Sequence, residues 1–84
     1  MLSNIKDEMT KRGFDVIEQE YDGDLIGLYL WNSQTYELDA TVEFEREAGR
    51  YIVRKYKTDN LTVQNKIVLD NPTSIDIYNA IDTK

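Results

Sequence analysis

The chain has 84 residues, with 16 acidic and 10 basic side chains, no histidine, no cysteine and a formal net charge of −6. Without histidine or cysteine it can form no disulfide, no cysteine-ligated zinc site or iron–sulfur cluster, and no Ser-His-Asp or Cys-His catalytic machinery. A domain of this length buries only about 60–65% of its unfolded surface, which favours binding on a surface over binding in a large internal cavity.

A short amphipathic helix is predicted from Ser3 to Arg12. The apolar residues Leu2, Ile5 and Met9 recur at helical spacing. Gly13 suits the left-handed position just past the end of a helix. We therefore expect one helix at the N-terminus, with its apolar stripe turned towards the core.

Two apolar-rich runs follow, Phe14–Tyr21 and Asp24–Trp31, joined by the pair Asp22-Gly23. This pair is preferred in the type I′ turn of a two-residue hairpin. This turn fixes the register of the hairpin and sets Ile17 opposite Leu28, Val16 opposite Tyr29 and Phe14 opposite Trp31. Both faces of the hairpin would then carry apolar side chains, and the second run would be an interior strand.

The segment from Tyr36 to Glu47 shows the clearest strand pattern, because it alternates strictly between two sets of residues. One face would hold Tyr36, Leu38, Ala40, Val42 and Phe44, and the other Glu37, Asp39, Thr41, Glu43 and Glu45. Ala48-Gly49 predicts a two-residue turn into a strand from Arg50 to Lys57. That turn would set Glu47 opposite Arg50, Glu45 opposite Ile52 and Glu43 opposite Arg54.

Thr58-Asp59-Asn60 predicts a third turn, into a strand from about Leu61 to Leu69. After Asp70-Asn71-Pro72 a C-terminal helix is expected, with proline in its first turn, a cap from Asn71, Thr73 or Ser74, and a narrow apolar stripe of Ile77, Tyr78 and Ile81. The predicted fold is therefore α+β, with an N-terminal helix, a five-stranded antiparallel β-meander and a C-terminal helix. It forms one compact domain of residues 1–84.

Charge is unevenly distributed along the chain. Residues 15–47 hold ten acids against one base, whereas residues 50–66 hold five bases against one acid. The expected pairing of the third and fourth strands would cancel part of this contrast. The remaining acids, which have no base nearby in sequence, form a candidate acidic binding surface of Glu18, Glu20, Asp22, Asp24, Glu37 and Asp39. General solubility is the alternative explanation of these acids.

Tyr29 and Trp31 form a candidate aromatic interface. The expected register places them on one face with Val16 and Phe14. Two short helices could cover one apolar face each, or leave one face partly open. An open aromatic face would be a partner or dimer surface, whereas core packing is the alternative role of these rings.

The remaining patterns carry little chemistry. The strand Arg50–Lys57 interleaves bases with aromatics, as in single-stranded nucleic-acid binders, but alternation divides its bases between two faces and the net charge of −6 disfavours a polyanion. Asp22-Gly23-Asp24 lacks the further ligands of a calcium loop, and no cleft is predicted beside any carboxylate pair. We expect no catalytic residue, metal site or cofactor.

The leading functional hypothesis is a small, acidic, non-enzymatic interaction protein or inhibitor. It would present its acidic surface to a basic protein partner, for example a nucleic-acid-binding protein. The alternative is a structural or assembly protein that homodimerises through the aromatic sheet face or a strand edge, and the second alternative is a weak single-stranded nucleic-acid binder. The N-terminus lacks the pattern of a secretory signal and no apolar run could span a membrane, so a cytoplasmic location without membrane contact is expected.

Overall fold

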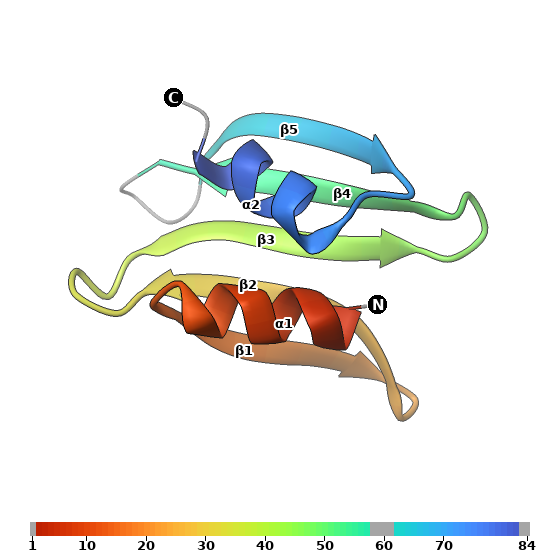
Figure 1. The fold of residues 1–84 in the computed structure, drawn as a ribbon, viewed down its shortest axis with the longest axis horizontal. Coiled ribbons are helices and arrows are strands. Elements are labelled where there is room, and N and C mark those ends of the chain that lie inside the picture. The colour runs from red at the N-terminus through yellow and green to blue at the C-terminus, as the bar shows by residue number, and fades with distance from the viewer. Residues whose placement is uncertain (1, 58–61, 83–84) are drawn as a thin grey trace.

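The structure is a computed structural model that describes residues 2–57 and 62–82. The chain forms an N-terminal helix, one antiparallel sheet of five strands in chain order and a C-terminal helix, which confirms the predicted α+β fold (Figure 1). The elements are α1 (Leu2–Lys11), β1 (Phe14–Tyr21), β2 (Asp24–Asn32), β3 (Leu38–Glu45), β4 (Arg50–Tyr56), β5 (Val63–Asp70) and α2 (Ser74–Asp82). The predicted turn at Thr58-Asp59-Asn60 lies outside the described residues.

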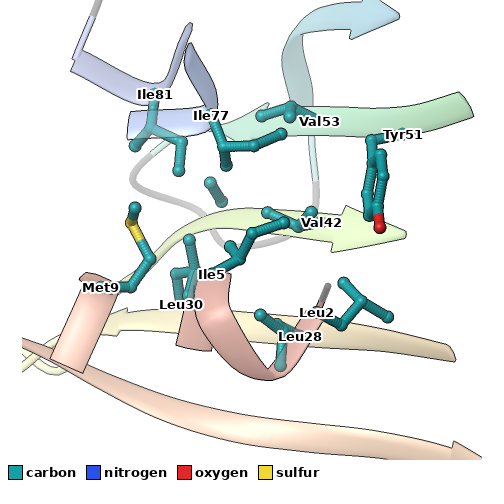
Figure 2. Close-up of a cluster of buried hydrophobic side chains, with 11 residues drawn as sticks. Leu2, Ile5, Met9, Leu28, Leu30, Val42, Tyr51, Val53, Ile77 and Ile81 are labelled. Atoms are coloured by element: carbon teal, nitrogen blue, oxygen red, sulfur yellow. The ribbon is translucent and has the colours of Figure 1, made fainter. Parts of the chain in front are cut away.

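Both helices pack on the same face of the sheet (Figure 1). The helix α1 contacts β1 and β2, α2 contacts β4, and the two helices touch each other. Figure 2 shows side chains from both helices meeting the inward residues of the sheet in one apolar cluster. In the part of the chain that the structure describes, no helix covers the opposite face, so the second of the two predicted arrangements is the one observed.

Each helix begins or ends at the signal that its sequence carries. In α1 the stripe of Leu2, Ile5 and Met9 is buried, and Gly13 follows the helix in the left-handed conformation with φ 99°. At the start of α2 the Asp76 backbone N–H donates to the Thr73 hydroxyl at 3.1 Å, and the Thr73 N–H donates to the Asp76 carboxylate at 2.9 Å. This is a reciprocal capping box.

Thr73 is thus the capping residue among the three candidates. Pro72, which we expected in the first helical turn, instead precedes the cap and is buried. The predicted stripe on α2 is confirmed, because Ile77 and Ile81 are buried and Tyr78 packs against the core cluster.

The register predicted for the first hairpin is wrong by one residue beyond its turn. The turn itself is as expected, with Tyr21 paired to Asp24. Glu20 pairs with Leu25 but Gln19 pairs with Gly27, so Ile26 is an extra residue in β2. This bulge makes Ile17 face Tyr29, Val16 face Leu30 and Phe14 face Asn32.

As a consequence, Val16 and Phe14 point to the helix side and pack against the core, whereas Tyr29 and Trp31 point to the other side. The prediction that all four residues share one face is therefore wrong.

A second bulge interrupts the alternation expected for the third strand. Leu30 pairs with Ala40 but Trp31 pairs with Leu38, so Asp39 is the extra residue. Leu38 consequently lies beside Trp31 on the face without helices, and Asp39 lies on the helix side. Tyr36, expected at the start of the strand, is in the preceding loop with φ 59° and is exposed.

The turn between β3 and β4 has four residues, 46–49, and not two. Glu45 therefore pairs with Arg50 and Glu43 with Ile52, two positions away from the predicted register. A shift by two keeps every side chain on its expected face. The predicted neutralisation is confirmed, since Arg54 contacts its predicted partner Glu43 at 3.0 Å and Arg50 contacts Glu45 at 3.1 Å in place of Glu47. Glu47 lies in the turn and no longer faces Arg50.

Candidate interaction surface

The sheet face opposite the two helices, which we call the open face, is organised in rows of directly paired residues. The central row crosses all five strands and contains Ile17, Tyr29, Thr41, Arg54 and Lys66. The row beside it contains Gln19, Gly27, Glu43, Ile52 and Val68. Because every strand contributes a residue to both rows, the face has two halves, one on β1 and β2 and one on β4 and β5.

The β1–β2 half is apolar and aromatic. Ile17 is 55% exposed, and Tyr29 and Trp31 are each partly exposed. Trp31, the single tryptophan of the chain, lies between Asp15 on β1 and Leu38 on β3. Asp15 is exposed, so an acidic group borders the aromatic pair on the outer strand.

The β4–β5 half combines basic and apolar groups. Arg54 and Lys66 end the central row, and Ile52 and Val68 end the row beside it. Val68 is 47% exposed, whereas Ile52 is nearly buried. On β5, Lys66 and Val68 are exposed on this face, and so is Asp70, which pairs with Arg50.

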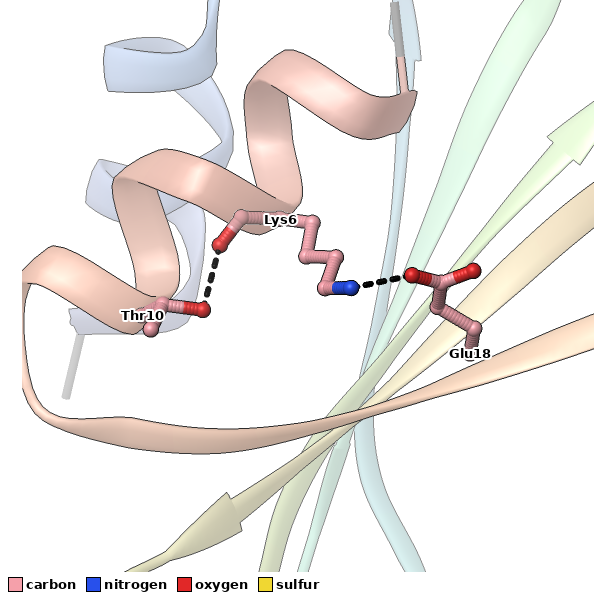
Figure 3. Close-up of polar contacts among 3 residues, drawn as sticks. All are labelled: Lys6, Thr10 and Glu18. Atoms are coloured by element: carbon pink, nitrogen blue, oxygen red, sulfur yellow. Dashed lines mark hydrogen bonds and ion pairs between the residues drawn. The ribbon is translucent and has the colours of Figure 1, made fainter.

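Two of the six predicted surface acids are paired with bases from elsewhere in the fold. Glu18 lies on the helix side of β1 and forms an ion pair with Lys6 of α1 (Figure 3). Hydrogen bonding and Coulomb attraction to Glu18 raise the pKa of Lys6. Asp24 contacts Arg46 of the β3–β4 turn at 3.4 Å, with both side chains largely exposed.

Asp39 is half-buried. Its bulge position turns it towards Phe14 on the helix side, where it lines two shallow pockets of about 240 and 280 Å³. Burial raises the pKa of Asp39, while a hydrogen bond from Asn32 and the charge of Lys55 act in the opposite direction. This carboxylate is therefore part of the fold's own polar network and does not face an incoming partner.

The other three acids lie at opposite ends of β2. Glu20 and Asp22 are exposed near the β1–β2 turn, and Glu37 is in the loop that follows β2. The nine residues of β2 separate the two ends by roughly 27–30 Å. The structure does not gather the six predicted acids into one continuous surface.

The described residues contain no group of three acidic side chains placed to hold a metal ion. Over the same ranges, no helix is long and apolar enough to cross a membrane. Comparison with family models, curated proteins and solved structures gives no match.

Sequence reasoning identified Tyr29 and Trp31 but missed the rest of this face. Ile17, Arg54 and Lys66 belong to it as much as the two rings do, because direct strand pairing places them in one row with Tyr29. Strand alternation was the available signal, but it identifies the face only once the bulge at Ile26 is known.

Proposed function

We propose that the protein is a non-enzymatic, cytoplasmic protein-binding module whose binding surface is the β1–β2 half of the open face. The observation that carries this proposal is the packing of both helices on one side of the sheet. It leaves Tyr29 and Trp31 beside the exposed Ile17 with no element of the described chain over them. Tyrosine and tryptophan at such positions are typical anchors of protein interfaces.

The partner surface that fits this half is apolar at its centre and basic at its rim. Asp15 borders Trp31 on the same face, and Asp22 and Glu37 lie beyond the two ends of β2. Acidic groups around an aromatic centre favour arginine and lysine, which can pair with carboxylates and stack on rings. Two of the acids predicted from sequence, Asp22 and Glu37, therefore lie at the rim of the aromatic centre, together with Asp15.

Nucleic-acid binding through β4 receives less support. Arg50 and Arg54 point to the open face, but each is already held by a carboxylate of β3. A phosphate group would have to displace Glu45 or Glu43 from its own base.

Site-specific photo-crosslinking in a native lysate tests the proposal. A photoreactive residue at position 17 is compared with one at position 75, because Ile17 and Ile75 are equally exposed but lie on the open face and on α2 respectively. We expect protein crosslinks at position 17 only, in a yield that falls as salt is raised from about 50 to about 500 mM. Equal yields at the two positions, or none at position 17, would refute the proposal.

A further inference from the structure

We infer that the partner is a second copy of this chain, with the β1–β2 half of each copy seated on the β4–β5 half of the other. This inference rests on the proposed binding role of the open face. The second copy is chosen because the open face carries both complementary surfaces. The β1–β2 half is aromatic and bordered by an acid, and the β4–β5 half carries the basic and apolar side chains that fit it.

The two halves match because of the order of residues in the central row. A two-fold axis that runs parallel to β3 and passes above Thr41 places the central row of the second copy over that of the first, in the reverse order. Tyr29 then lies over Arg54 of the second copy, and Ile17 lies over Lys66 of the second copy. Guanidinium groups stack favourably on tyrosine rings, and the methylene stem of lysine covers aliphatic side chains.

The charges select this orientation over the alternative. A two-fold axis perpendicular to the strands, along the central row, would place each strand on its own copy and set Arg54 against Arg54 and Lys66 against Lys66, which joins like charges. The axis parallel to β3 instead brings Asp15 within reach of Lys66 of the second copy, one diagonal step along the strand. Glu43 approaches its own symmetry mate near the axis, but its charge is balanced by Arg54 at 3.0 Å.

The size of the face sets the expected strength of the dimer. Five strands spaced by about 4.8 Å, each about eight residues long at about 3.3 Å per residue, give a face of roughly 500 Å² per copy. Burying both copies removes roughly 1,000 Å², which is at the lower end for a specific interface. We therefore expect a reversible dimer that dissociates on dilution in the micromolar range.

Sedimentation velocity on the wild-type chain, from about 1 to about 500 µM, is the first measurement. A monomer–dimer equilibrium is expected, with a concentration-dependent change in the fluorescence of Trp31, the only tryptophan, as the open face becomes covered. A monomer over the whole range would refute the inference about the second copy.

Charge reversal then tests the orientation. Asp15→Lys and Lys66→Glu are both exposed positions on opposite edge strands, and each variant should weaken its own homodimer at least about tenfold. An equimolar mixture of the two variants should dimerise like the wild type, because every cross-copy contact then joins one acid and one base. Asp7→Lys on the outer surface of α1 makes the same charge change away from the face and should leave dimerisation unchanged.

Failure of the mixture to recover dimerisation would refute this orientation, and so would equal weakening by Asp7→Lys. The crosslinking experiment separates this inference from the proposed function. If position 17 crosslinks to a different protein while the pure chain stays monomeric, the binding role of the open face stands and the second copy is refuted. If position 17 forms no crosslink, both the proposed function and the inference about the second copy are refuted.

Discussion

The open face exists because α2 packs on the same side of the sheet as α1, and replacing Ile77 by alanine tests that packing. Ile77 is fully buried in the cluster that also contains Ile5 of α1 and Val53 of β4. Ile75, on the same helix, is 53% exposed. Ile75→Ala is therefore a matched control, since it removes the same atoms and makes the same change in helix propensity.

The expected loss for Ile77→Ala follows from the atoms removed. Three buried carbons at about 0.8 kcal/mol each give about 2.4 kcal/mol of lost transfer free energy. A residual cavity of about 60 Å³, at about 24 cal/mol per Å³, adds about 1.5 kcal/mol. The total of about 4 kcal/mol is a large part of the roughly 4–13 kcal/mol expected for the unfolding of a chain this long. Ile75→Ala should change the free energy of unfolding by no more than about 0.5 kcal/mol.

Urea denaturation followed by far-UV circular dichroism measures both values, and Val68→Ala completes the set. If α2 packed on the open face, Val68 would be buried beneath it, and removing its two methyl carbons would cost about 1.6 kcal/mol in transfer free energy before any cavity is counted. We expect Val68→Ala to cost much less, because this side chain is 47% exposed on the uncovered face. Equal losses for Ile77→Ala and Ile75→Ala, or a loss of about 1.6 kcal/mol or more for Val68→Ala, would show that the assignment of the two faces is wrong.

Three further substitutions test local features by the same unfolding assay. Burial raises the folded-state pKa of Asp39 above its ordinary value of 3.8, so the wild-type protein loses stability as pH rises from 3.8 through the raised pKa. Asp39→Asn should therefore become progressively more stable relative to wild type between about pH 3 and pH 7. A difference in stability that stays constant or shrinks over this interval would contradict this prediction. Thr73→Ala removes the hydroxyl that accepts from the Asp76 N–H and should cost about 1 kcal/mol, with no loss indicating that the cap is dispensable. Gly27→Ala would place a Cβ 3.0 Å from the Val42 carbonyl oxygen in the neighbouring strand and should cost about 1–3 kcal/mol, whereas a neutral result would mean that this approach is looser than described.

The helices and the first turn could be predicted because their signals are local. The stripe of Leu2, Ile5 and Met9 needs only helical spacing, and Gly13 marks the end of that helix without reference to any other element. The pair Asp22-Gly23 likewise adopts its turn from its own backbone preferences, with φ angles of 54° and 85°. These elements required no knowledge of what packs against them.

The two bulges could not be predicted in the same way. β2 carries apolar residues on both faces, so pairing with or without the extra Ile26 would bury an apolar row against β1 either way. At Asp39 the sequence reads as perfect alternation, yet the strand inserts a residue there and turns Leu38 to the other face. The choice in each case depends on how the helices fill the space over the sheet, which is a tertiary effect.

The candidate site was predictable in part for the same reason. Tyr29 and Trp31 stand out by residue type, but whether they are core or surface depends on which face receives α2. The acids were misleading because the bases that pair with Glu18 and Asp24 come from α1 and from a distant turn. A charge that has no counter-charge nearby in sequence can still have one in space.

Exposure is unevenly distributed across the open face. Thr41 and Ile52, at its centre, are nearly buried although no helix of the described chain lies over them, because their neighbours on the same face shield them. Ile17 and Val68, on the two outer strands, are about half exposed. Isolated surface aliphatic residues are ordinary, but these two lie where the proposed dimer sets β1 of one copy against β5 of the other. In the proposed dimer, contact between β1 of one copy and β5 of the other would cover Ile17 and Val68, and the two-fold symmetry would form this contact twice.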